Sequence, residues 1–241
     1  QCSFYQDWQM VVLNWSIKQN WPDAKFTRLL NCTSEKKKDY KYGDIMPTVF
    51  APDFEVHPIS GDAYSPYNKP VGILKFLEDK NIKDRWIVVA DPDQIIKKPM
   101  NDLKPARGLA IAQSIPFEMK DLNKFAEYFN IDPKTVDLVN VPIVIHQSDL
   151  RKLAPLWLEY TEKLRQNPEL SKLADWIAEM YGYLFAAAKI GLKHVAKPDL
   201  GDRTPYSASG YSLHYDLDHE SFDKTVKWNK RTYMSEDVLT G

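Results

Sequence analysis

The sequence has little cysteine, no long hydrophobic run and almost no net charge, and each shortage excludes a class of protein. Its 241 residues include two cysteines, Cys2 and Cys32, which are too few for a disulfide framework and do not have zinc-site spacing. No stretch of about 18 apolar residues occurs, so no membrane-spanning helix is predicted. The net charge of −1 gives the whole chain no electrostatic case for binding nucleic acid or an anionic membrane.

The sequence also shows no amino-terminal leader with a basic and an apolar part. The chain begins at Gln1 rather than at a methionine, which leaves open that a leader or anchor has been removed. The composition is otherwise ordinary, with 44% hydrophobic and 27% charged residues. A chain of this size can bury a substantial core and is predicted to form one large α/β domain or two small ones.

What the sequence does contain is a short apolar run that ends on two carboxylates. Residues 85–93 read Arg-Trp-Ile-Val-Val-Ala-Asp-Pro-Asp, a pattern typical of a buried strand in a parallel sheet. Because ligands gather at the carboxyl ends of such strands, Asp91 and Asp93 are expected at the rim of a cleft. Two close carboxylates repel each other unless a cation lies between them, and Mg²⁺ or Mn²⁺ suits such oxygen ligands. The alternative is an ordinary polar turn.

Hydrophobic spacing predicts strands and helices in alternation along the chain. We expect helices over 6–18, 121–129, 149–166 and 173–189, and strands over 25–32, 85–91, 109–112, 141–145, 194–196 and 211–215. Pro142 indicates an early or edge position for its strand, and Pro155 predicts a kink or restart in its helix. Closely spaced prolines between 46 and 67 predict an irregular excursion, which the interleaved aromatic residues should keep ordered. Asn68 is then expected to cap a helix. This order predicts a single α/β domain with a mostly parallel central sheet.

Several separated segments resemble one family of enzymes. In chain order they are residues 2–9, 26–33, 57–62 with 68–70, 87–93, 150–157, 176–183 and 213–215. They are similar to the peptidyl-serine α-galactosyltransferases of plants and algae and to the hydroxyproline O-arabinosyltransferases, and they span nearly the whole chain. The resemblance implies one glycosyltransferase domain of the GT-A type over residues 1–241, with a Rossmann-like sheet and a nucleotide-sugar donor.

The resemblance also implies a metal site. In the family's pattern the Asp-x-Asp motif holds a divalent cation, Mn²⁺ or Mg²⁺, against the donor diphosphate. Asp93 is then expected to bind the metal directly, and Asp91 to share it or to bind the donor ribose. His214, on a late strand, is expected to complete the coordination. Without the resemblance, His214 would be interpreted as a structural histidine on an apolar strand.

The resemblance further implies a retaining transfer, which needs a group opposite the leaving group to stabilise or trap the cation-like sugar. Glu179 is the expected catalytic residue, and Asp175, one turn earlier on the same predicted helix, is the reserve. Trp176 and Tyr183 are candidates to line the sugar site, with core packing as the alternative. Since a departing diphosphate gains negative charge, nearby cations should stabilise it. The donor-binding candidates beside Asp91 are Arg28, Asn68, Lys69, Asn140, Lys230 and Arg231.

The sequence departs from the family in two places. Family members have a strand just ahead of the segment at 2–9, and a sheet without that strand would leave an edge open. The region 113–136 is shorter than in the plant enzymes and lacks their cysteines. Few cysteines favour a reducing compartment, so the Golgi or ER lumen of the plant enzymes and the cytoplasm of a microbial or viral relative both stay open.

Three functions are consistent with the sequence. The first is a metal-dependent retaining glycosyltransferase that moves galactose or arabinose from a UDP-sugar to a hydroxyl group, expected to be a serine or hydroxyproline of a protein. The second keeps the donor but glycosylates a hydroxymethylated base of DNA, using the basic residues of 36–41 and 224–231, and its DNA affinity would fall steeply with salt. The third is a carbohydrate-binding module without turnover, whose sugar binding would ignore metal and nucleotide.

Overall fold

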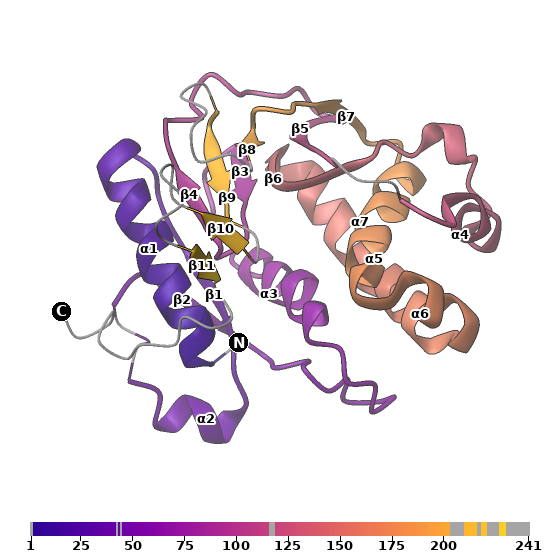
Figure 1. Cartoon of the computed structure of the whole chain (residues 1–241), viewed down its shortest axis with the longest axis horizontal. Coiled ribbons are helices and arrows are strands. Elements are labelled where there is room, and N and C mark those ends of the chain that lie inside the picture. The colour runs from indigo at the N-terminus through magenta and orange to yellow at the C-terminus, as the bar shows by residue number, and fades with distance from the viewer. Residues whose placement is uncertain are drawn as a thin grey trace.

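The computed structural model describes residues 2–41, 43, 45–115, 119–202, 210–215, 218–220 and 227–229, in which helices flank several sheets (Figure 1). The helices are α1 (Phe4–Asn20), α2 (Ser34–Lys38), α3 (Asn68–Leu77), α4 (Leu122–Phe129), α5 (Gln147–Gln166), α6 (Pro168–Ala174) and α7 (Ala178–Lys189). Short 3₁₀ turns cover Ser65–Tyr67, Pro133–Thr135 and Asp175–Ile177. None of the described helices has the length and apolar character needed to cross a membrane.

The strands form one four-stranded sheet and three smaller ones in the described part of the chain. They are β1 (Arg28–Asn31), β2 (Thr48–Ala51), β3 (Trp86–Val89), β4 (Gln94–Ile96), β5 (Leu109–Ser114), β6 (Val139–His146), β7 (Lys193–Ala196), β8 (Gly201–Asp202), β9 (Ser212–His214), β10 (Asp218–Glu220) and β11 (Lys227–Asn229). The largest sheet has the order β3-β6-β5-β7, and the others pair β1 with β2, β4 and β8 with β9, and β10 with β11. The predicted α/β class is therefore confirmed.

The central sheet is mixed rather than mostly parallel as expected, because β6 runs antiparallel to both neighbours and only β5 and β7 pair in parallel. An edge position for the strand with Pro142, one of the two positions expected, is wrong, since β6 is paired on both sides. The reason is a bulge: the register passes from Ala112 opposite Ile143 to Gln113 opposite Asn140. Pro142 lies in the skipped stretch, where no N–H is needed for the ladder.

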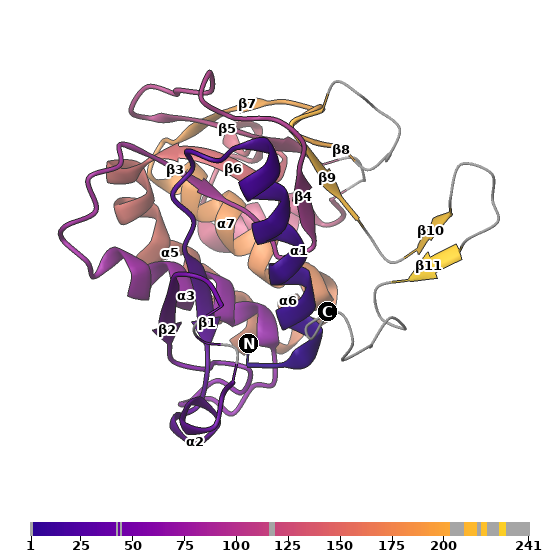
Figure 2. The same cartoon turned by 90° about the vertical axis from the view of Figure 1, so that its left-hand side faces the viewer.

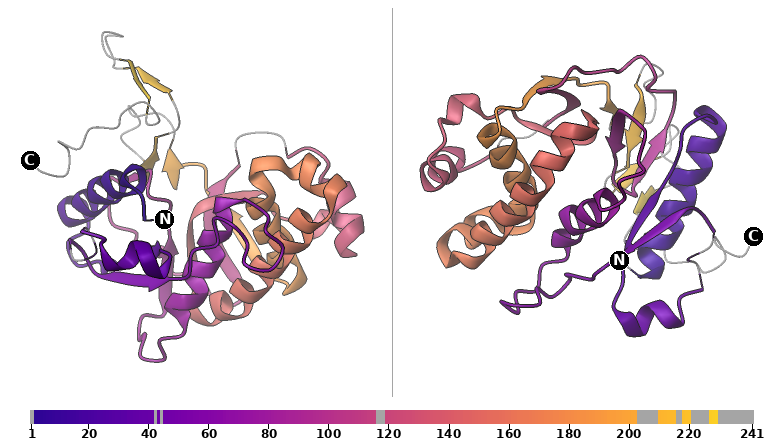
Figure 3. Two further views of the ribbon diagram at one scale, coloured as in Figure 1. Left: turned by 90° about the horizontal axis from the view of Figure 1, so that it is seen from below. Right: turned by 180° about the vertical axis from the view of Figure 1, so that it is seen from behind.

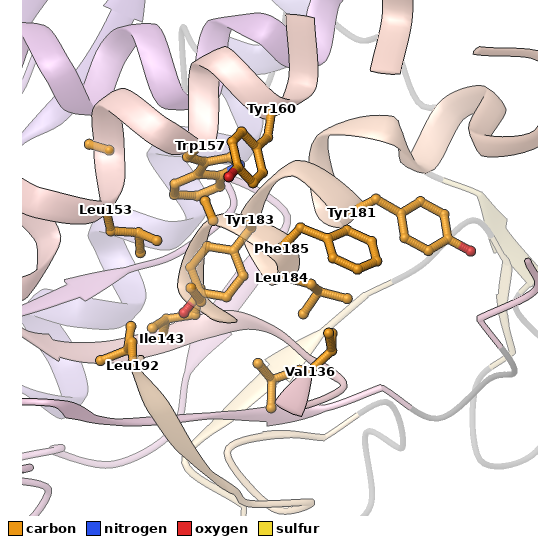
Figure 4. Packing of buried hydrophobic residues seen from close by; sticks show 14 of the residues in the cluster. Val136, Ile143, Leu153, Trp157, Tyr160, Tyr181, Tyr183, Leu184, Phe185 and Leu192 are labelled. Atoms are coloured by element: carbon orange, nitrogen blue, oxygen red, sulfur yellow. The ribbon is translucent and has the colours of Figure 1, made fainter. Parts of the chain in front are cut away.

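Helices α5 and α7 cover the central sheet and contribute several aromatic residues to one buried cluster (Figure 4). Trp157 of α5 packs against Tyr183 of α7 with ring centres 4.9 Å apart. The helices approach closely because Gly182 has no side chain, and a Cβ there would lie 2.2 Å from the Thr161 hydroxyl. Helix α5 continues through Pro155, so the predicted restart is wrong.

The helix expected over 173–189 is divided into α6, a 3₁₀ turn and α7. The division falls at Asp175, whose φ of 44° lies in the left-handed region and cannot continue an α-helix. The short helix α2 lies in a charged stretch for which hydrophobic spacing predicted no element. Asn68 lies inside the first turn of α3 rather than capping it, since the N-cap is Tyr67. Hydrophobic spacing does not predict the backbone conformation at Asp175, at residues 34–38 or at Asn68.

On the other side of β3, helix α1 lies beside β4 (Figure 2). The Asn20 amide donates to the Ile96 carbonyl at 2.8 Å, and the Ser16 hydroxyl accepts from the Ile96 N–H at 2.9 Å. A disulfide joins Cys2, just before α1, to Cys32, just after β1. Sequence spacing had not predicted this bond, which ties the start of α1 to the end of β1.

The edges of β1 and β3 face a common cleft. Among the described strands β1 pairs with β2 and β3 pairs with β6, and a cavity of about 1190 Å³ is lined by both, by α1 and by α3. Trp86, Ile87 and Val88 of β3 are partly exposed, whereas their partners on β6 are buried. Among the described strands, β3 is thus the end strand of its sheet, and its free edge lies at the cleft.

Candidate active site

The acidic pair lies where β3 ends at the cleft. Asp91 and Asp93 both line the cavity, and Asp93 is 9% exposed. His214 reaches them because β9 runs antiparallel to β4, with His214 opposite Gln94. Its Nε2 atom is 3.3 Å from Oδ1 of Asp93. One strand pairing therefore brings together residues that are far apart in the sequence.

The three side chains can hold one divalent cation. Each offers a ligand atom, and these atoms all lie within 4.8 Å of one another. Two carboxylates and an imidazole form a set of oxygen and nitrogen ligands of the kind that Mn²⁺ accepts. The donor set thus fits the predicted metal, and the predicted ligands Asp91, Asp93 and His214 do lie together.

Lys69 joins the acidic pair to Glu179. Its Nζ is 2.9 Å from Oδ1 of Asp91 and 3.3 Å from Oε2 of Glu179. Burial alone lowers the pKa of the Lys69 ammonium, but the two carboxylates outweigh that effect and raise the pKa above its ordinary value. Lys69 therefore carries a fixed positive charge at the centre of the site.

Glu179 is buried at the start of α7 and faces the cleft. It is 5% exposed, and it also lines a small inner pocket together with Asn140 and Met180. Burial raises the pKa of the Glu179 carboxyl group, while the positive charge of Lys69 opposes the rise. A carboxylate held beside one cation in a nearly dry place can stabilise positive charge on a bound group.

Asp175, the reserve catalytic residue, lies in a different setting. It is exposed and precedes α7, and it is not among the residues that line the cleft in the described part of the chain. The two carboxylates predicted to lie one turn apart on one helix are separated by the backbone turn at Asp175. Geometry therefore favours Glu179, and the role of either residue stays a prediction.

The remaining donor-binding candidates differ in whether their side chains line the cleft and in how far other residues already bind them. Arg28 lines the cleft but is 1% exposed, forms an ion pair with Asp7 and donates to the Tyr40 hydroxyl at 2.9 Å. The Asn68 side chain accepts from the Phe54 N–H at 2.6 Å and donates to Asp53 at 3.0 Å. Asn140 lines the cleft and the inner pocket. Lys230 and Arg231 lie outside the described residues.

Sequence reasoning missed the residues that hold the site together. The hydroxyl of Tyr64 accepts from the Glu179 N–H at 2.8 Å and donates to the Trp176 carbonyl at 2.7 Å. Arg165 of α5 grips Asp62 through two hydrogen bonds of 2.9 and 2.8 Å. Both Tyr64 and Asp62 belong to the excursion whose prolines and aromatic residues predicted an ordered segment. The prolines and aromatic residues predicted that the segment is ordered, but they did not predict which residues it contacts.

Comparison with known proteins gives the family and the fold. The sequence model of the hydroxyproline O-arabinosyltransferase family N-terminal domain matches residues 1–196. The peptidyl serine alpha-galactosyltransferase of Arabidopsis thaliana is 33% identical, covering 98% of this chain and 32% of that protein. The protein of the same name from Chlamydomonas reinhardtii is 27% identical, covering 80% of this chain and 29% of its own length. Hydroxyproline O-arabinosyltransferase 1 of Arabidopsis thaliana is 27% identical, covering 97% of this chain and 69% of that protein.

The chain thus spans about a third of the length of the first two relatives. Among solved structures, the galactosyltransferase LgtC with donor and acceptor sugar analogues has a TM-score of 0.54 at 11% identity, covering 88% of this chain and 83% of that one. An active-site mutant of LgtC has a TM-score of 0.56 at 12% identity, covering 98% and 92%. At such low identity the likeness concerns the fold, and it confirms the predicted GT-A type.

Proposed function

Because the chain belongs to the hydroxyproline O-arabinosyltransferase family, we propose that it transfers a sugar from a nucleotide-sugar donor to a hydroxyl group of a protein. The donor is a UDP-sugar that carries galactose or arabinose, and the acceptor is serine or hydroxyproline. The observation that carries the proposal is the cluster of Asp91, Asp93 and His214 at the cleft, with Lys69 and Glu179 beside it. That combination suits a diphosphate leaving group next to a cation-like sugar.

Asp91, Asp93 and His214 would hold Mn²⁺ or Mg²⁺ in this proposal. The bound ion supplies positive charge that offsets the charge gained by the leaving diphosphate. Lys69 adds a second fixed cation, since Asp91 and Glu179 keep it protonated. The chain's own contribution is to place these charges before the donor arrives, so that no reorganisation is needed during the reaction.

Transfer breaks the bond between the anomeric carbon and the diphosphate oxygen, and the electron pair leaves with the diphosphate. In a retaining reaction Glu179 stabilises or traps the cation-like carbon from the opposite face, and the acceptor oxygen then forms the new bond while its proton passes to the departing diphosphate. The buried position of Glu179 at the cleft supports this role. Asn140, in the same inner pocket, is placed to bind donor hydroxyl groups.

Family membership favours a protein acceptor over the two alternatives. The DNA hypothesis depends on the basic residues of 36–41 and 224–231. Lys36, Lys37 and Lys38 are exposed on α2, whereas residues 224–226 and 230–231 lie outside the described part. A binding module without turnover does not account for a buried Glu179 beside a cation site.

We also propose an oxidising compartment for the protein, such as the lumen of the secretory pathway. The disulfide between Cys2 and Cys32 supports it, because such bonds persist outside the reducing cytoplasm. The few cysteines had favoured a reducing compartment, and this pairing outweighs that count. Titration of free thiols in protein isolated from its native source tests the proposal: two free thiols per chain would refute it.

A thermal-shift panel of nucleotide sugars with and without Mn²⁺ tests the function. A ligand that binds only the folded state raises the melting temperature, so a UDP-sugar should do so only when Mn²⁺ is present. Sugar binding that ignores both nucleotide and metal would instead indicate a binding module. If no nucleotide sugar raises the melting temperature, either with or without Mn²⁺, the donor assignment is refuted.

Glu179→Gln and Asp175→Asn separate the two catalytic candidates. Glu179→Gln should lower turnover at least about 100-fold while leaving donor affinity within a few-fold, because the charge acts in the transition state. An equal loss of turnover and donor affinity would assign Glu179 to binding. A large loss of turnover in Asp175→Asn alone would move the catalytic role to Asp175.

A further inference from the structure

Trp176 is a large apolar side chain exposed at the cleft. It is 63% exposed and lies in the 3₁₀ turn directly before α7. The same cleft lining includes Lys69 and Glu179. By contrast, Tyr183, the other aromatic residue predicted to line the sugar site, is 3% exposed and bonds to His194. An indole kept in water beside a polar site is typical of a surface that binds a partner.

Tyr64 holds Trp176 and Glu179 in one frame. Its hydroxyl donates to the Trp176 carbonyl at 2.7 Å and accepts from the Glu179 N–H at 2.8 Å. Its ring also meets the indole edge-on, with ring centres 5.9 Å apart. Tyr64 is 3% exposed, so this frame is part of the folded core. A group resting on the indole is therefore presented at a fixed place relative to Glu179.

The turn that follows Tyr64 also contributes residues to the cleft lining. Ser65 and Pro66 line the cleft together with Trp176, and Tyr67 behind them is fully buried. The Tyr67 hydroxyl donates to Asp62 at 3.1 Å, and Asp62 is in turn held by Arg165. These contacts fix the turn before any ligand binds, which lowers the entropy lost on binding.

The chemistry of this corner suits the acceptor better than the donor. A donor diphosphate and ribose need cations and polar partners, which are provided by the metal ligands and Lys69. The indole face instead offers a flat, electron-rich apolar surface. Exposed aromatic rings are the surfaces on which proline-containing peptides dock, in an extended helix that is already ordered before binding. A pyrrolidine ring is also the ring of hydroxyproline.

We propose that Trp176, with the turn at Ser65 and Pro66, forms an acceptor subsite that stacks a pyrrolidine ring of the acceptor peptide beside its reacting hydroxyl group. This inference rests on the proposed function, because it assigns the acceptor of that same site. Trp176 contributes affinity and selectivity for the acceptor, while Lys69 and Glu179 act on the donor.

The test compares Trp176→Ala and Trp176→Phe with Trp15→Ala. Trp15 is an equally matched control, since it is 60% exposed on α1 and is not among the residues that line the cleft. Two serine peptides are offered, identical except that proline or alanine flanks the serine. Three quantities are measured: the KM for each peptide, the calorimetric affinity for each peptide, and hydrolysis of UDP-galactose with Mn²⁺ in the absence of acceptor.

Trp176→Ala should raise the KM and weaken the affinity for the proline peptide about tenfold, the size of one aromatic stacking contact. The alanine peptide should change less than threefold, donor hydrolysis less than twofold, and Trp176→Phe should restore most of the affinity. Trp15→Ala should change none of these quantities.

Three outcomes would overturn the inference. They are equal effects on both peptides, failure of the wild-type protein to bind the proline peptide, and a fall in donor hydrolysis as large as the fall in transfer. Absence of donor hydrolysis in the wild-type protein would refute the proposed function instead. The peptide affinities would still decide the role of Trp176 in that case, since they require no turnover.

Discussion

The two sides of β3 are built in different ways. We call β5, β6, β7 and α4 to α7 the packed side, and α1, α2, α3, β1 and β2 the cleft side; Figures 1 and 3 show α3 where the two sides meet. On the packed side, buried rings contact one another. The ring centre of Phe129 lies 4.3 Å from that of Tyr160 and 5.3 Å from that of Phe185. On the cleft side, Asp7, Arg28 and Asn31 are buried polar residues.

This contrast indicates how the chain leaves room for a ligand without losing its fold. On the cleft side, a cavity of about 1190 Å³ lies between its elements and β3, and a smaller buried cluster joins Leu13 of α1 to Ile96 and Val144. Specific bonds also hold this side: the disulfide of Cys2 and Cys32, the ion pair of Arg28 with Asp7, and the Asn68 amide. We therefore expect substitutions on the packed side to cost stability and those at the cleft to cost activity.

The largest effect on stability is expected from Phe185→Ala on the packed side. Phe185 is fully buried, and removal of such a ring leaves a cavity that costs about 3–5 kcal/mol of unfolding free energy. Urea unfolding measures it. Tyr128→Ala is the control, because this ring is 45% exposed and should cost less than about 1 kcal/mol. Equal losses in the two variants would mean that the packed side does not carry the stability.

Loss of the disulfide should be the next largest effect. Cys2→Ser with Cys32→Ser frees a loop with a sequence separation of 30, which should cost about 2–4 kcal/mol. Adding a thiol reductant to the wild-type protein should give the same loss, and adding it to the double variant should give none. If the reductant leaves the wild-type unfolding curve unchanged, the cleft side is not held by this bond.

Asp93→Asn should separate activity from stability at the cleft. Loss of one charged metal ligand should lower transfer at least about 100-fold, equivalent to about 2.7 kcal/mol of barrier. The unfolding free energy should change by less than about 1 kcal/mol, since repulsion from Asp91 is relieved. Asp23→Asn is the control, an exposed carboxylate that also lines the cleft. An unchanged rate of sugar transfer in Asp93→Asn would refute the assignment of Asp93 as a metal ligand.

The smallest effect is expected from Asp62→Asn, where the excursion meets α5. Hydrogen bonds from Arg165 hold the pKa of Asp62 below its usual 3.8, so folding favours the carboxylate. This contribution is fully present above about pH 4 and is lost as the pH falls through the folded-state pKa. Wild type should exceed the variant by about 1–2 kcal/mol at pH 6, and the difference should shrink at pH 3. A difference that does not depend on pH would contradict the ion-pair explanation.

Much of the site was predictable because its chemistry is local in the sequence. The carboxylates of Asp91 and Asp93 follow directly from an apolar strand, and the spacing of two acids at a strand end suggested a cation by itself. His214 was different, since only the resemblance pointed to it. Its place depends on the antiparallel pairing of β9 with β4, and such long-range pairing leaves no periodic signal in a single sequence.

Several predictions of local structure were wrong for the same reason. Pro142 was expected near an edge, but the bulge between β5 and β6 removes the need for its N–H. The helix expected over 173–189 breaks where Asp175 takes a left-handed conformation, although nothing in its hydrophobic spacing changes there. In both cases contacts with other elements outweigh the preference of the segment alone.

The sequence by itself determined the α/β class and the acidic pair, because both follow from the order of apolar and charged residues along short stretches. Only the tertiary structure decided that Lys69 lies between Asp91 and Glu179, that Tyr64 fixes Trp176 beside Glu179, and that Asp175 lies outside the cleft lining among the described residues. Those relations depend on how distant segments pack, and packing is a property of the whole chain rather than of any one stretch.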